Sequence, residues 1–148
     1  MVLYNHADIA MGETNEIKCL PYLEKHLGLS LTRTHRWCPF DYFGGSRIWV
    51  ELKSRRISYN DHTEVQLAIG KVNFARDPKR ICYIAFYFEP DDALYVIKFN
   101  KEQFETFERQ TDFRRKDRPF QSSTTMVLVP MRLLTLVPMP KNNSPADV

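Results

Sequence analysis

The chain has 148 residues, of which 43% are hydrophobic and 13% are aromatic. This composition predicts a folded chain with a single hydrophobic core and excludes a disordered or collagen-like protein. The formal net charge is only +3, so binding to a polyanion depends on where the basic residues lie. The cysteines Cys19, Cys38 and Cys82 are odd in number and have no Cys-x-x-Cys spacing, which argues against a disulfide framework or a zinc site.

The ends of the chain carry no targeting signal that we recognise. The N-terminus lacks the basic and apolar regions of a signal peptide, and no apolar run is long enough to cross a membrane. We therefore expect a soluble intracellular protein without a membrane partner, in the cytoplasm or, for a viral or phage protein, in the host cell. Residues 1–137 are expected to form one domain, and the proline-rich residues 138–148 a disordered tail.

The first half of the chain predicts a helix followed by strands. Residues 12–27 have apolar side chains at helical spacing, and Gly28 is placed to end the helix, although Pro21 is unfavourable inside it. Residues 29–37 alternate as in a strand. Residues 39–53 then predict a hairpin that turns at Gly44 and Gly45.

The second half predicts another helix and more strands. Residues 63–75 read as a helix, residues 81–88 and 94–99 as a hairpin around a turn at 89–92, and residues 101–110 as a short helix. Residues 125–137 are strand-like and interrupted by Pro130. This order is typical of an α+β arrangement around a mixed sheet.

The hairpin carries the most informative residues. In a strand, alternate side chains share a face, so Trp49, Glu51 and Lys53 point away from an apolar set. The apolar set is Ile48, Val50 and Leu52. Asp41 is expected across the hairpin from Glu51, and two close carboxylates repel unless a cation lies between them. Magnesium prefers oxygen ligands and often uses one or two carboxylates with water and phosphate. These groups suit metal-assisted phosphodiester hydrolysis, although a solvated strand face is the alternative.

Several positions in this order of elements resemble the PD-(D/E)xK nuclease superfamily. They are the Gly12 to Glu16 spacing in the first helix, Asp41 before the turn, the Glu51-Leu52-Lys53 element, and Gln66 in the next helix. Phe40 stands where the motif's name has proline. The resemblance spans residues 12–99 and implies an α/β/α sandwich with a restriction-endonuclease-like core, in which helices flank a central mixed sheet.

The resemblance also implies roles for these residues. Asp41, Glu51 and the carbonyl of Leu52 would bind Mg²⁺ or Mn²⁺, and Glu16 would complete that shell or hold a second ion. Lys53 would orient or deprotonate the attacking water, and Gln66 would complete the catalytic set. As alternatives, Glu16 is a first-turn glutamate favoured by the helix dipole, and Gln66 is a polar residue on a helix flank.

Basic residues around the hairpin are expected to contact DNA phosphates without reading sequence. They are Arg33, Arg36, Arg47, Arg55, Arg56 and Lys71. A second basic stretch, residues 114–118, falls in a predicted loop. The resulting prediction is a metal-dependent DNA endonuclease that selects DNA structure, similar to Holliday-junction resolvases, acting as a homodimer without a small-molecule cofactor. The alternatives are a restriction-type, exonucleolytic or transposition-complex nuclease, or a non-catalytic nucleic-acid-binding module.

Overall fold

The computed structural model describes residues 6–113 and 124–140. The predicted basic stretch at 114–118 and most of the predicted tail, 141–148, therefore lie outside the described residues. Within the described residues, no helix combines the length and the apolar character needed to cross a membrane. The elements, in chain order, are α1 (His6–Leu27), β1 (Thr32–Arg33), β2 (Tyr42–Gly44), β3 (Ile48–Arg55), β4 (Glu64–Ala68), α2 (Ile69–Ala75), β5 (Ile81–Phe88), the 3-10 helix η1 (Glu89–Asp91), β6 (Ala93–Lys98), α3 (Lys101–Glu105), β7 (Arg109–Phe113), β8 (Thr124–Pro130), the 3-10 helix η2 (Met131–Leu133) and β9 (Thr135–Val137).

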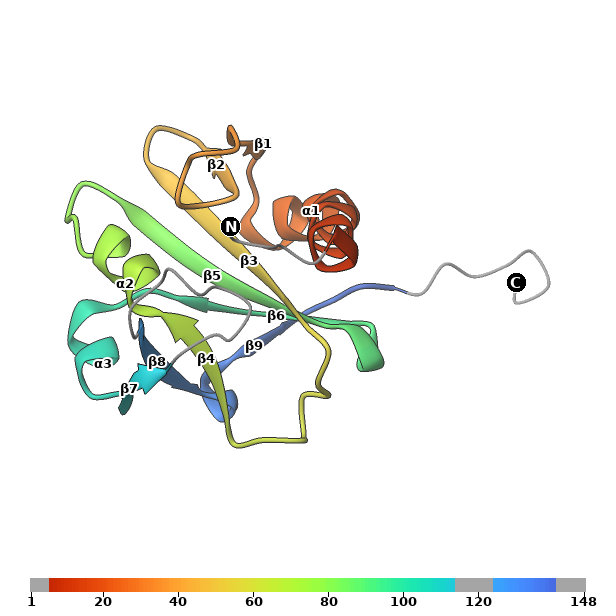
Figure 1. Cartoon of the computed structure of the whole chain (residues 1–148). Coiled ribbons are helices and arrows are strands. Elements are labelled where there is room, and N and C mark those ends of the chain that lie inside the picture. The colour runs from red at the N-terminus through yellow and green to blue at the C-terminus, as the bar shows by residue number, and fades with distance from the viewer. Residues whose placement is uncertain (1–5, 114–123, 141–148) are drawn as a thin grey trace.

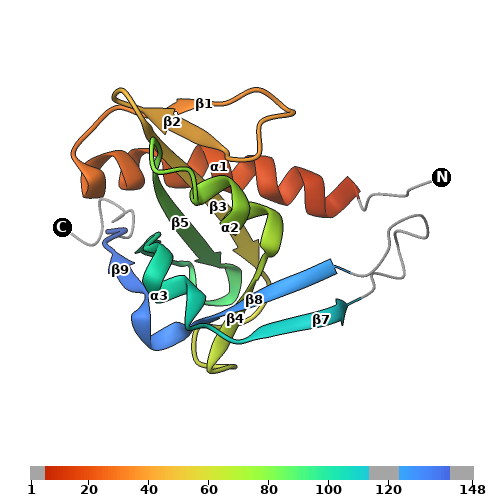
Figure 2. The ribbon, with the colours of Figure 1, turned by 90° about the vertical axis from the view of Figure 1, so that its left-hand side faces the viewer.

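The strands form two sheets. The main sheet has six strands in the order β1-β2-β3-β5-β6-β9, and it is mixed because β3 and β5 run parallel while its other pairs are antiparallel. The second sheet has the order β4-β8-β7 and is antiparallel. Helix α1 covers one face of the main sheet, while α2, α3 and the second sheet lie on the other (Figure 1). Figure 2 shows the molecule from that second side, with α1 behind.

The side chains of strand β5 point alternately to the two faces of the main sheet, and both faces are buried. Ile84, Phe86 and Phe88 pack with the second sheet, α2 and α3. Ala85 and Tyr87 point the other way and belong to the cluster beneath α1. A strand buried on both faces needs a nearly continuous apolar run, and residues 81–88 supply one. The predicted α+β arrangement around a mixed sheet is confirmed.

Helix α1 is longer than the sequence suggested. It begins at His6 rather than at residue 12, and it ends at Leu27 as expected. Gly28 follows with a φ of 70°, and its N–H and that of Leu29 both bond to the carbonyl of Glu24 at 2.8 and 3.2 Å. A left-handed residue at this position closes a helix, and glycine adopts it without strain. Pro21 lies inside the helix on an exposed side.

Two helices were predicted too long, and both errors involve the second sheet. Residues 63–75 form strand β4 and then the short helix α2, and residues 101–110 form α3 followed by the start of β7. In each case β8 supplies the pairing partner: Val129 lies opposite Val65 of β4, and Val127 lies opposite Arg109 of β7. Residues 29–37 also form less strand than predicted, since only Thr32 and Arg33 pair with β2. The second sheet therefore covers much of a face that the sequence analysis gave to helices.

Candidate functional site

The end of the β2–β3 ladder brings Asp41 opposite Glu51. The last paired residues of β2 and β3 are Tyr42 and Val50, and the N–H of Asp41 still bonds to the Val50 carbonyl at 3.1 Å. One step farther, the Asp41 side chain replaces the backbone, because its Oδ2 accepts the N–H of Leu52 at 2.8 Å. The predicted placement of the two carboxylates across the hairpin is thus what the structure has.

Glu51 is a buried carboxylate with two very different oxygens. Only 1% of its side chain is exposed, and its Oε2 lies 3.3 Å from Nζ of Lys53 and 3.0 Å from Nζ of Lys71. Among the described residues, its Oε1 is buried and has no hydrogen-bond partner. A buried polar atom without a partner is costly, so this oxygen marks a place where the fold lacks a positive group.

Burial raises the pKa of both carboxyl groups. Burial raises the pKa of Glu51 to about 7, and the charge of Asp41 adds to this effect while Lys53 and Lys71 oppose it. Burial also raises the pKa of Asp41, against the hydrogen bonds that Glu51 and the Leu52 N–H make to it. The two carboxyl groups lie within hydrogen-bonding reach of each other. They need either a shared proton or a cation between them.

Glu16 joins this pair from helix α1. Its carboxyl group is within hydrogen-bonding reach of Asp41, and burial raises its pKa while Arg33, 3.9 Å away, lowers it. The carbonyl of Glu16 also accepts the hydroxyl of Tyr42 at 2.6 Å, which ties the helix to β2. Because α1 begins at His6, Glu16 lies well inside the helix, so the helix-dipole explanation for this residue is wrong.

Lys71 belongs to the carboxylate site, a position that the sequence did not predict for it. It lies on the first turn of α2, where its Nζ contacts Glu51 and also donates to the carbonyl of Pro39. The sequence predicts that Lys71 contacts DNA phosphates, and this stays a prediction. The predicted helix of residues 63–75 did not indicate that Lys71 contacts β3. The contact forms because the observed helix α2 is shorter and follows strand β4.

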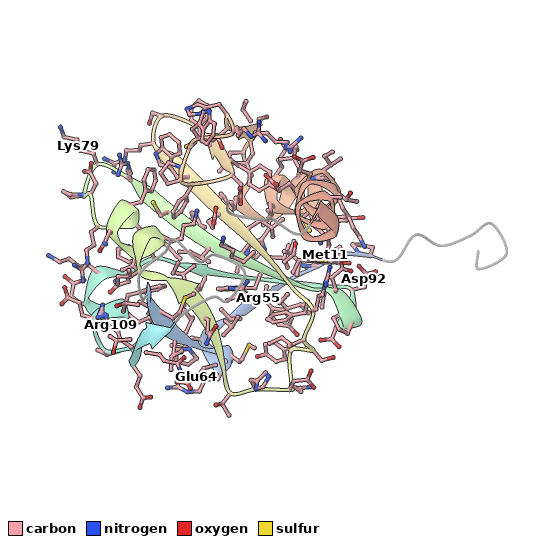
Figure 3. All side chains as sticks on the ribbon, viewed as in Figure 1. Met11, Arg55, Glu64, Lys79, Asp92 and Arg109 are labelled. Atoms are coloured by element: carbon pink, nitrogen blue, oxygen red, sulfur yellow. The ribbon has the colours of Figure 1, made fainter. Side chains whose placement is uncertain are left out.

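Gln66 lies on strand β4 instead of a helix, so its predicted setting is wrong. Its side-chain amide donates to Oε1 of Gln110 at 3.1 Å, and its carbonyl accepts from Nη2 of Arg55 at 2.5 Å. Figure 3 shows Arg55 in the space between the main sheet and β4. Within the described part of the chain, Gln66 makes no recorded contact with Glu16, Asp41 or Glu51. The structure therefore does not bring Gln66 into the carboxylate group.

The predicted DNA-binding arginines differ in their contacts and exposure. Arg33 is partly used by Glu16, and Arg55 is half-buried against β4. Arg36, Arg47 and Arg56 are exposed. The guanidinium of Arg36 lies 5.7 Å from the ring centre of Trp37, at the start of the loop that leads to Asp41.

The donor set suits a hard divalent cation that keeps water and substrate ligands. In the described residues, no three His, Cys, Asp or Glu side chains are arranged to hold a metal ion by themselves. Magnesium commonly needs only one or two protein carboxylates. Asp41 and the unpartnered Oε1 of Glu51 meet that requirement, and the carboxyl group of Glu16 lies within hydrogen-bonding reach of Asp41.

Comparison with known proteins adds nothing to this geometry. No protein-family model matches the chain, and no curated protein or solved structure is significantly similar to it.

Two open hollows border β4, one of them about 720 Å³ in volume and lined in part by Tyr59, His62 and Glu108. Neither hollow includes the carboxylates. The candidate site lies instead where the pairing of β2 with β3 ends, and its central residue, Glu51, is buried.

Proposed function

We propose that this chain is a metal-dependent nuclease that hydrolyses phosphodiester bonds in DNA, built on a restriction-endonuclease-like core of the PD-(D/E)xK type. One observation carries the proposal. Glu51 is almost fully buried, with Oε2 held by two lysines and Oε1 without a donor, beside the carboxyl group of Asp41. A buried carboxylate of this kind lowers the stability of the fold, and it is typical of sites where a bound cation and substrate supply the missing interactions.

A divalent cation accounts for the unpartnered oxygen. Asp41, Glu51 and the Leu52 carbonyl would hold Mg²⁺ or Mn²⁺, and Glu16 would complete the shell or hold a second ion. When bound, such an ion lowers the pKa of a coordinated water and neutralises charge on the phosphate. A neutral ligand would leave the repulsion between the carboxylates in place.

The chain's own residues would prepare this chemistry before any substrate arrives. The Leu52 N–H fixes the orientation of Asp41, and Lys71 holds Oε2 of Glu51 so that Oε1 faces the ligand position. Lys53 shares that face and would orient the attacking water and stabilise the negative charge of the transition state. Fixed charges of this kind act without reorganisation during the reaction.

The substrate is proposed to be DNA with a distinctive structure, as for Holliday-junction resolvases, which act as homodimers. The small size of the chain favours recognition of shape over a long sequence. Restriction-type, exonucleolytic and transposition-complex nucleases of the same fold remain alternatives. A non-catalytic nucleic-acid-binding module is disfavoured, because Asp41, Glu51 and Lys53 are all present and adjacent.

Cleavage of a panel of labelled DNA forms tests the proposal. The panel contains linear duplex, single strand, a flap, a four-way junction and RNA, each with magnesium and with chelator. We expect cleavage only with the cation, and its loss in Asp41→Asn, Glu51→Gln and Lys53→Ala. Glu105→Gln, an exposed carboxylate on α3, is the matched control. Undiminished cleavage by Glu51→Gln would contradict the assigned site.

A further inference from the structure

The loop between β1 and β2 begins and ends at the carboxylate site. Its two ends are joined by the N–H of Thr34, which bonds to the carbonyl of Asp41 at 2.8 Å. The loop therefore leaves the hairpin at the end that holds Asp41 and Glu51, opposite the turn at Gly45. Figure 2 shows this connection projecting from the strands in the region coloured orange.

The second half of the loop is fixed against the site. Phe40 is fully buried and its ring stacks on Phe74 with centres 4.6 Å apart. The Pro39 carbonyl accepts from Lys71, the same ammonium that pairs with Glu51. The loop is also turned by a bond of 3.0 Å from the Cys38 N–H to the His35 carbonyl. A loop with these anchors holds its tip in a defined place.

The tip presents a large aromatic ring to solvent. Trp37 is 83% exposed, more than Ile17, Phe43 or Leu136, the other large exposed hydrophobic residues of the described chain. The Arg36 guanidinium lies within cation–π range of the ring, yet most of Trp37 stays accessible. Single exposed hydrophobic residues are ordinary. An exposed tryptophan with an arginine beside it, on an anchored loop that ends at Asp41, is a more specific arrangement.

We propose that Trp37 and Arg36 form a stacking platform that accepts an unpaired DNA base next to the bond to be cut. The inference rests on the proposed nuclease function and names its substrate class, DNA that carries an unpaired or extruded nucleotide. Aromatic side chains with arginine bind single-stranded nucleic acid because every base has a face to stack. A base inside a duplex is already stacked, so the platform favours substrates in which one base is free.

The chain itself limits how far the platform lies from the cleaved bond. Trp37 and Asp41 are four residues apart in sequence. Successive Cα atoms lie about 3.8 Å apart, so the two residues are at most about 15 Å apart. Nucleotides advance by about 3.4 Å along a strand. The cut is therefore expected within about five nucleotides of the unpaired base.

Binding measured in chelator tests the platform without requiring activity. The chain has two tryptophans, so the Trp49→Phe variant reports the fluorescence of Trp37 alone. We expect a duplex with a single-base bulge to quench this signal more strongly than the perfect duplex. In the otherwise native chain, Trp37→Ala is expected to weaken binding of the bulged duplex on the order of tenfold, with Trp37→Phe closer to wild type. Leu136→Ala, an exposed residue on β9, is the control.

Cleavage mapping then separates the two proposals. Cuts clustered within about five nucleotides of the bulge, with the preference over perfect duplex reduced by Trp37→Ala, support the platform. Cleavage with an unchanged preference in Trp37→Ala would overturn the platform and leave the nuclease intact. Trp37-dependent quenching without any cleavage would support the platform and refute the nuclease. Trp37-dependent self-association in sedimentation, with no quenching by DNA, would assign the ring to a second copy and overturn the inference.

Discussion

At the scale of single residues, the molecule buries the carboxyl group of Glu51 in a place that disfavours its negative charge. Both Asp41 and Glu51 have raised pKa values, chiefly through burial, and the charge of Asp41 raises the pKa of Glu51 further. The ammonium groups of Lys53 and Lys71 offset part of that cost at one oxygen of Glu51 only. Groups of this kind are common where function, rather than stability, selects the residue.

Replacing Glu51 by glutamine is expected to stabilise the chelated protein at pH 8. The folded-state pKa of Glu51 is about 7, above the ordinary value of 4.5, so the folded state holds more protons between these values. Stability from this group therefore falls as the pH rises from 4.5 to 7, and the full cost is present at pH 8. Glutamine cannot ionise and avoids the cost. Thermal unfolding in chelator at pH 8 and pH 5 measures this, with a larger gain expected at pH 8. A lower Tm for the variant at pH 8 would contradict it.

Lys71→Ala is expected to slow cleavage by about ten- to a hundredfold at saturating DNA, the range typical for partners that orient metal ligands. The alanine variant leaves Oε2 of Glu51 with only the Lys53 contact, so the carboxylate is less firmly placed. Cleavage rates at saturating DNA, with a magnesium titration, measure this effect. Lys79→Ala, an exposed lysine between α2 and β5, is the control. If Lys71 only contacts DNA phosphates, the variant will instead weaken binding and flatten its salt dependence.

At the scale of elements, local patterns predicted the hairpin and missed the second sheet. The alternation of residues 48–53 and the turn at Gly45 are local signals, and they placed Asp41 opposite Glu51 correctly. Residues 63–75 carry a helical spacing as well, but β4 forms because β8 offers Leu67 and Val65 a buried position. A partner so distant in sequence leaves no trace in the local pattern. The contact between Lys71 and Glu51 was not predicted for the same reason.

Leu67 distinguishes the strand from the helix. In the helix that the sequence predicted, Val65, Ala68, Ile69 and Val72 face inward, which would leave Leu67 outside. In β4, Leu67 is fully buried. Leu67→Ala is therefore expected to lower the free energy of unfolding by about 2–5 kcal/mol, measured by urea denaturation. A loss below about 0.5 kcal/mol, the size of an ordinary surface effect, would contradict the position of β4.

At the scale of the whole molecule, packing on both faces of the main sheet controls which groups solvent reaches. Cys19 of α1 and Cys82 of β5 are buried on opposite faces of the sheet, whereas Cys38 lies in the loop that carries Trp37. Burial raises the pKa of Cys19 to about 12 and that of Cys82 to about 11. Both thiols are therefore protonated and shielded at neutral pH.

A thiol reagent is expected to modify one cysteine rapidly in the native protein at pH 8, and that cysteine is Cys38. The reaction requires an accessible thiolate, which Cys19 and Cys82 do not offer in the folded state. The rate and stoichiometry of modification measure this, with the urea-unfolded chain, in which all three react, as the reference. Cys38→Ser should remove the rapid phase. Rapid modification of Cys19 in the native chain would mean that α1 does not pack as described.

The bond from the Leu52 N–H to Asp41 has a consequence for how this chain evolves. Beyond β2, the Asp41 carboxylate covers a backbone donor of β3 that would otherwise invite a strand from a second molecule. Losing Asp41 would thus expose the chain to aggregation as well as to loss of the proposed activity. If the proposed cleavage were no longer under selection, Glu51, whose burial is costly, would be free to change, while selection for folding would retain Asp41. Non-catalytic relatives of this chain are therefore expected to keep the aspartate at position 41 and to replace the glutamate at position 51.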